Sequence, residues 1–195
     1  MRGVVVAAMA AVLALGACQR ERPNEKLPGE RPVTVVEPET RVDAVPQEEP
    51  AVARSQWRAS TEQTRSVTGN LRVSLEGRRG GPVVFAFANG ITVRAQPYNV
   101  VPADQRSGSG GQSFAAVLGG DPRVEAYLYR VLDENLIPGR QTGLCGEATA
   151  RHLAVSEFVD SSGRWVFKIA AFRGEAQPPS SADPELCAAY AYTAQ

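Results

Sequence analysis

The chain has 195 residues, of which 43% are apolar and 22% charged, and its formal net charge is zero. This composition is typical of a soluble globular domain with additional segments, and it excludes a collagen-like chain, a coiled coil and a polytopic membrane protein. Neither the proline-rich first part nor the remainder is basic, so the chain lacks the positive surface that nucleic-acid binding requires.

The first residues have the pattern of an export signal. Arg2 precedes an apolar run from Val4 to Leu15, which is too short to cross a bilayer as a helix. The run ends in Leu15-Gly16-Ala17-Cys18, which resembles the lipobox of bacterial lipoproteins. The resemblance implies a signal peptide over residues 1–17, acylation of Cys18 and cleavage before it. An ordinary secretory signal with a chance cysteine is the alternative.

Acylation of Cys18 would hold the mature protein at a membrane through several fatty-acid chains. The next residue is Gln19 rather than aspartate, and by resemblance to sorting in enteric bacteria this implies the outer membrane, with the inner membrane as the alternative. We therefore expect a lipid-anchored protein of the bacterial cell envelope that faces the periplasm.

A proline-rich segment, residues 18–55, follows the signal. It mixes proline with Glu and Arg and contains no aromatic residue. Proline removes backbone donors and disfavours helix at the preceding residue, and the segment has too little apolar surface to offset the entropy of ordering. We expect a disordered or polyproline-II tether that, at about 3 Å per residue, spans on the order of 100 Å. Its prolines are Pro23, Pro28, Pro32, Pro38, Pro46 and Pro50.

Residues 56–195 alternate between apolar and polar side chains, a pattern typical of antiparallel strands. The predicted fold class is mainly β: a single antiparallel sheet, or a small barrel or sandwich domain, with one disulfide. The first expected strand covers residues 66–76 and buries Val67, Leu71, Val73 and Leu75.

Packing predicts the loop lengths of two hairpins. A three-residue loop at residues 88–90 pairs Phe85 with Val93 and keeps the phenylalanines on an apolar face, whereas a two-residue Asn-Gly turn sets them beside polar residues. Burial of two phenylalanines is worth on the order of 3–6 kcal/mol, more than turn preferences. A loop at residues 161–163 likewise pairs Val159 with Trp165. Glu157 falls on the apolar face of that hairpin, so we expect it either at a sheet edge or in a functional role.

Two segments fit helix and strand equally well by spacing. Residues 123–132 follow Asp121-Pro122, which would start a helix, but their tyrosines favour a strand. Residues 184–192 have the same ambiguity. We prefer strand for both because their neighbours are strands.

If Cys18 carries lipid, Cys145 and Cys187 remain as an even pair in an exported chain. A disulfide between them closes a loop of about 43 residues and stabilises the fold by about 4 kcal/mol. The alternative is a reactive thiol at Cys145, which would need a nearby base, and His152 is the only histidine.

No metal or cofactor site is expected. His152 has no second histidine or Cys-x-x-Cys companion, and its position opposite Leu153 predicts an exposed side chain. Asp133 and Glu134 would point to opposite faces of a strand. The Gly/Ser-rich residues 107–111 lack the lysine and helix of a phosphate loop and need be only a flexible connection.

Ser107-Gly108-Ser109-Gly110 with Phe114 is similar to a loop of small β-barrel lysozyme-inhibitor lipoproteins, although the aromatic residue is displaced and the downstream spacing differs. We expect a non-enzymatic binding or scaffolding module for an envelope protein or glycan, with hydrolase inhibition as one version. The alternative is an envelope enzyme that acts on peptidoglycan or polysaccharide through carboxylates such as Glu147 and Glu157. Two carboxylates about 5–10 Å apart in one cleft would favour the enzyme.

Overall fold

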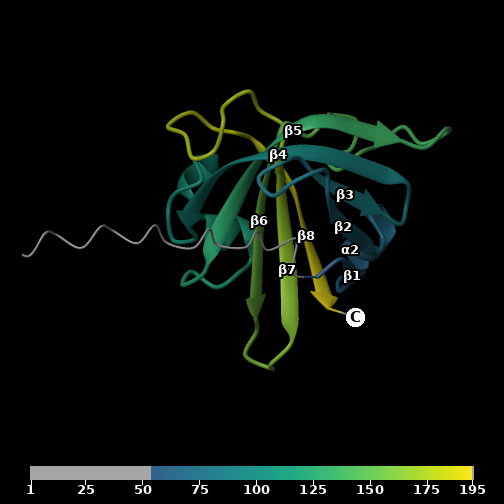
Figure 1. The fold of residues 1–195 in the computed structure, drawn as a ribbon. Helices are drawn as coiled ribbons and strands as arrows, with labels where there is room; N and C mark the ends of the chain where they lie inside the picture. The colour runs from purple at the N-terminus through teal and green to yellow at the C-terminus, as the bar shows by residue number, and fades with distance from the viewer. Residues whose placement is uncertain (1–53, 195) are drawn as a thin grey trace, which may run out of the picture. The chain divides into compact units, whose positions relative to one another are not determined.

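Strands with apolar residues at alternate positions close on themselves into an antiparallel barrel (Figure 1). The computed structural model describes residues 54–194. The expectations for the signal peptide, for Cys18 and for the tether as far as residue 53 lie outside the described residues, while the mainly β fold class is confirmed. The elements are β1 (Gln56–Ala59), α2 (Glu62–Val67), β2 (Leu71–Leu75), β3 (Val83–Phe87), β4 (Ile91–Pro102), η1 (Ser109–Gly111), α3 (Phe114–Leu118), β5 (Glu125–Leu136), β6 (His152–Val159), β7 (Trp165–Phe172) and β8 (Leu186–Ala194).

The strands follow chain order around the barrel, and β1 closes it by pairing with both β2 and β8. Both predicted hairpin registers are confirmed: Phe85 pairs with Val93, and Val159 pairs with Trp165. Gly90 has a φ of 85°, which any residue with a Cβ atom disfavours, and its amide donates to the Phe87 carbonyl. The strand preference for residues 123–132 and 184–192 is confirmed by β5 and β8.

Side chains fill the barrel interior. Its largest members are fully buried aromatic rings, and four of them make two ring contacts: Trp57 with Phe167 at 4.9 Å, and Phe85 edge-on to Tyr129 at 5.6 Å between centroids. The barrel is therefore a packed core of the kind that small closed sheets form. The other large side chains of this inner cluster are Leu71, Val73, Val83, Phe87, Ile91, Val93, Leu144, Leu153, Val155, Ile169, Tyr190 and Tyr192.

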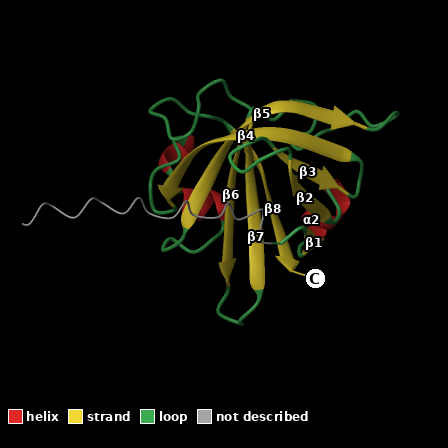
Figure 2. Ribbon diagram, in the orientation of Figure 1, coloured by secondary structure: helices red, strands yellow, loops and turns green. Residues whose placement is uncertain are grey.

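A second core lies outside the barrel wall, where helix α3 covers part of the sheet (Figure 2). Ser113 caps α3 by accepting from the Ala116 amide, and Gly119 ends it in the left-handed conformation. Phe114 and Val117 of the helix pack with outward-facing Leu128 and Phe172 of the strands. Strand β5 is consequently apolar on both faces, which explains why the spacing of residues 123–132 did not distinguish strand from helix.

The predicted strand at residues 66–76 is wrong in its first part. Thr61 accepts from the Thr64 amide and starts α2, which ends at Val67, and the strand begins only at Leu71. The Thr68 hydroxyl lies 2.8 Å from the hydroxyl of Tyr192, inside the barrel. The N-cap and the buried pair of hydroxyl groups therefore stabilise a helical turn in a segment whose alternating pattern predicted a strand. None of the helices among residues 54–194 is both long and apolar enough to cross a bilayer.

The loop between β5 and β6 covers one end of the barrel, which we call the plug end. Leu144 of this loop is 1% exposed and belongs to the inner cluster, and its carbonyl accepts from the Tyr190 hydroxyl at 2.5 Å. The predicted Cys145–Cys187 disulfide is confirmed, with a Cα–Cα distance of 5.3 Å. It ties the loop to β8.

Glu134 holds the same loop from inside the barrel. Its carboxylate oxygens accept from the amides of Leu144 at 2.6 Å and Ala150 at 2.9 Å. A Cβ at Gly143 would collide with this carboxylate, so glycine is required for the close approach. Asp133 points the other way and lies 3.6 Å from Arg94, as adjacent residues on a strand must.

Candidate functional site: a charged groove on the barrel wall

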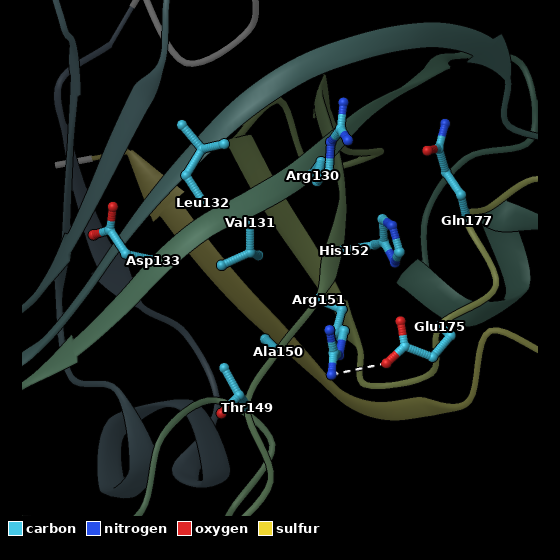
Figure 3. A pocket seen from close by; sticks show the side chains of 10 residues that line it. All are labelled: Arg130, Val131, Leu132, Asp133, Thr149, Ala150, Arg151, His152, Glu175 and Gln177. Atoms are coloured by element: carbon cyan, nitrogen blue, oxygen red, sulfur yellow. Dashed lines mark ion pairs between the residues drawn. The ribbon is translucent and has the colours of Figure 1, made fainter.

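An open groove of about 480 Å³ lies on the outer face of the sheet where β5 meets the start of β6 (Figure 3). Strand β5, the residues that lead into β6 and the loop between β7 and β8 form its walls. Two arginines, a histidine, two acids and an amide line it. The lining residues are Arg130, Val131, Leu132, Asp133, Thr149, Ala150, Arg151, His152, Glu175 and Gln177.

His152 is buried, with 5% of its surface exposed, so the prediction of an exposed side chain is wrong. The predicted orientation, opposite to Leu153 and away from the barrel interior, is right, but other parts of the chain cover that outer face. The ring of Tyr98 contacts the imidazole edge-on, with 6.3 Å between centroids. The Tyr98 hydroxyl donates to the carbonyl of Pro178 and so holds the β7–β8 loop over the histidine.

The imidazole has an unused polar atom. Nδ1 of His152 is buried and has no hydrogen-bond partner among residues 54–194. Burial lowers the pKa of His152, and the positive charges of Arg130 and Arg151 lower it further. The ring is therefore neutral at pH 7, and a neutral ring can donate from one nitrogen or accept at the other.

The charges around the groove do not cancel. Arg151 pairs with Glu175 at 2.8 Å, and Asp133 lies near Arg94 rather than near the groove cations. Arg130 is exposed and forms no ion pair with any described residue. Figure 3 shows the imidazole between the side chains of Arg130, Arg151 and Gln177. An arginine without a partner beside an amide and an imidazole can bind a carboxylate or phosphate oxygen.

This groove could not be predicted from the sequence, because its parts become neighbours only through strand pairing. Arg130 stands opposite His152 in the β5–β6 register. The connecting segment from residue 137 to residue 151 is too long to reveal that register, and Gln177 arrives from a third segment. Their convergence had no signal in the sequence.

The two carboxylates considered for an enzyme are not brought together. Glu147 is exposed in the loop at the plug end, before β6 begins. Glu157 lies five residues into β6, roughly 16 Å along the strand from its start. The groove contains neither of them.

Glu157 is instead an interior residue. It pairs with Phe167 and shares the inward orientation of Leu153 and Val155. Both carboxylate oxygens are buried without hydrogen-bond partners among the described residues. Burial raises the pKa of Glu157 to about 7, although the charge of Arg54 opposes this shift. One of the two expectations placed Glu157 at a sheet edge, and this applies only in part. Strand β6 has no β5 partner after Val155, but at Glu157 it still pairs with β7.

The Gly/Ser-rich segment is built into the structure and does not project from it. Ser107 is fully buried and its hydroxyl donates to the Gln112 carbonyl, and Ser109 is 9% exposed. A Cβ at Gly108 would lie 2.6 Å from the Ser180 carbonyl oxygen, so the segment packs tightly against the β7–β8 loop. These hydroxyls do not form a protruding binding loop.

Within residues 54–194, histidine, cysteine and acidic side chains do not gather in threes at a spacing that could hold a metal ion. No protein-family model, curated protein or solved structure matches the chain. The groove with Arg130 and His152 is thus the candidate site.

Proposed function

We propose that the protein is a non-enzymatic binding module of the bacterial cell envelope, lipid-anchored at Cys18 in the outer membrane and facing the periplasm. The groove beside His152 binds an anionic group of an envelope protein or glycan. The observation that carries this proposal is the Arg130 guanidinium next to the buried imidazole of His152; among residues 54–194 the guanidinium has no ion pair and one ring nitrogen has no hydrogen-bond partner. The anchor follows from the lipobox-like Leu15-Gly16-Ala17-Cys18.

The packed barrel supports recognition at the outer surface rather than in the interior. Aromatic and aliphatic side chains fill the barrel interior, whereas the groove is open to solvent and is lined by polar groups. A carboxylate that accepts from Arg130 gains a charge-assisted hydrogen bond, worth about 1.5–3 kcal/mol. Hydrogen bonds from the neutral histidine and the Gln177 amide would then orient the bound carboxylate.

Binding of soluble peptidoglycan fragments with free carboxylates tests the groove. The chain from residue 18, with Cys18→Ser to keep it soluble, is titrated with these fragments and with the same fragments after methyl esterification. We expect binding to the free acids only, weakened about tenfold or more by Arg130→Gln because one charge-assisted bond is lost.

Arg58→Gln is the matched control, because Arg58 is an exposed arginine on β1. Equal affinity for the free acids and the esters would reject the groove as the binding site. Equal affinities of the Arg130→Gln and Arg58→Gln variants would reject it as well. Intact mass of the native protein tests the anchor independently: a mass without added acyl chains rejects it.

A further inference from the structure

The β6–β7 hairpin projects beyond the barrel wall at the end opposite the plug (Figure 1). Strand β5 pairs with β6 only as far as Val155, so the last residues of β6 continue with β7 alone. We call the outer part of this hairpin, residues 158–166, the hairpin tip. It ends in a turn at residues 160–164, where Asp160 pairs with Arg164 at 3.1 Å.

The tip exposes apolar surface. Val159 is 48% exposed and its cross-strand partner Trp165 is 40% exposed. Both side chains point to the side of the hairpin whose other apolar residues, closer to the barrel, belong to the inner cluster. At the tip, the barrel no longer covers this side. They therefore form a joined apolar patch, unlike the separate exposed residues Val100 and Ile137.

A cation lies on this patch. The guanidinium carbon of Arg54 is 4.7 Å from the centroid of the Trp165 ring. Tryptophan with arginine is the composition preferred at the boundary between bilayer and water, where the ring sits among the headgroups and the cation meets lipid phosphates. The Asp160 charge is balanced within the turn by Arg164.

The position of Arg54 in the chain favours a lipid surface as the occupant of the patch. Arg54 lies just before β1, on the side of the domain from which the chain leads back to Cys18. A lipid anchor at Cys18 confines the domain to within the span of the tether, on the order of 100 Å, and so raises the effective concentration of lipid at the patch; a surface with weak affinity of its own then suffices for contact.

We propose that the hairpin tip, through Trp165, Val159 and Arg54, contacts the lipid surface in which Cys18 is anchored. This inference rests on the anchor of the proposed function. Contact at the tip places the start of β6, with the groove of Arg130 and His152, roughly 20 Å farther from the lipid. The groove would then face the periplasm, available to its ligand.

Tryptophan fluorescence of the native lipidated protein in vesicles tests the contact. The chain has two tryptophans, and Trp57 is fully buried in the barrel, so a change at the surface reports Trp165. The vesicles contain phosphatidylethanolamine and phosphatidylglycerol with brominated acyl chains. We expect bromine to quench Trp165, and acrylamide quenching to fall about twofold or more, because lipid displaces water from the exposed ring. Trp165→Phe should abolish both changes.

Val159→Ser should weaken the bromine quenching of Trp165, whereas Val100→Ser, a change at an equally exposed valine on β4, should not. Absence of bromine quenching in protein whose mass shows the acyl chains overturns the contact and leaves the anchor and the groove standing. Equal acrylamide protection in the Cys18→Ser chain without vesicles also overturns it, because the chain itself would then cover the patch. A mass without acyl chains removes the anchor, and the contact with it.

Discussion

The two ends of the barrel are built in opposite ways. At the plug end, Leu144 enters the inner core and is held by the Cys145–Cys187 disulfide and the Glu134 carboxylate. At the end with the hairpin tip, β6 leaves its β5 neighbour and buries the carboxylate of Glu157, which has no hydrogen-bond partner in the described part of the chain. One end is stabilised by several satisfied interactions, and the other retains a polar group that costs stability. This contrast predicts that substitutions at the plug end cost more stability than substitutions at the hairpin tip.

Arg140 extends the bonding of the plug end. Its guanidinium donates to the carbonyls of Asn89 and Val67, both at 2.7 Å. The β5–β6 loop is thereby joined to the turn after β3 and to the end of helix α2. A long loop that would otherwise be mobile becomes part of the folded wall of the groove, because Thr149 and Arg151 follow directly from it.

The largest expected effect comes from removing the disulfide. Cys145→Ala together with Cys187→Ala should lower the free energy of unfolding by about 4 kcal/mol, because the loop closed by the bond regains its freedom in the unfolded chain. Chemical denaturation measures this. The wild-type protein in reductant is the control and should lose a similar amount. A loss below about 1 kcal/mol would show that the other plug contacts suffice.

Leu144→Ala should cost about 3 kcal/mol, because it leaves a cavity among inner-cluster side chains. Ile137→Ala is the matched control, because Ile137 begins the same loop but is 56% exposed, and it should cost less than about 1 kcal/mol. Equal losses for the two variants would mean that Leu144 does not act as a plug.

The fold was largely predictable because its strands obey simple alternation. Burial of Phe85 and Phe87 selected the three-residue loop before β4, and the export-type cysteine count predicted the disulfide. Contacts between residues distant in sequence were not predictable. Tyr98 and the β7–β8 loop cover His152 only because closure of the barrel brings them together. The groove belongs to this second class, since the register of Arg130 with His152 follows from tertiary pairing.

Glu157 should make stability depend on pH. Its pKa is about 7 in the folded protein, above the ordinary value of 4.5, so the folded state binds more protons between these two values. Stability therefore falls as the pH rises through that interval, and the loss is complete above pH 7.

Glu157→Gln removes this titration. At pH 8 it should raise the free energy of unfolding by on the order of 1–2 kcal/mol, a figure reduced for the partial exposure of the residue, and at pH 4 it should change little. Denaturation curves across this range provide the measurement. Glu147→Gln, an exposed control, should leave the profile unchanged. A wild-type profile that Glu157→Gln does not flatten would mean that the carboxylate finds a partner in solution.

The smallest expected effect is at the hairpin tip itself. Val159→Ser should change the free energy of unfolding by no more than about 0.5 kcal/mol, because the side chain is half exposed and lies outside the inner cluster. Val155→Ser, four residues earlier with the same orientation, buries a hydroxyl in the core and should cost several times more. Thermal unfolding of both variants measures the difference. A large cost at Val159 would assign the apolar tip to folding stability. A negligible cost would mean that folding stability does not require the exposed valine and tryptophan of the tip. That result is expected if this surface serves to contact lipid.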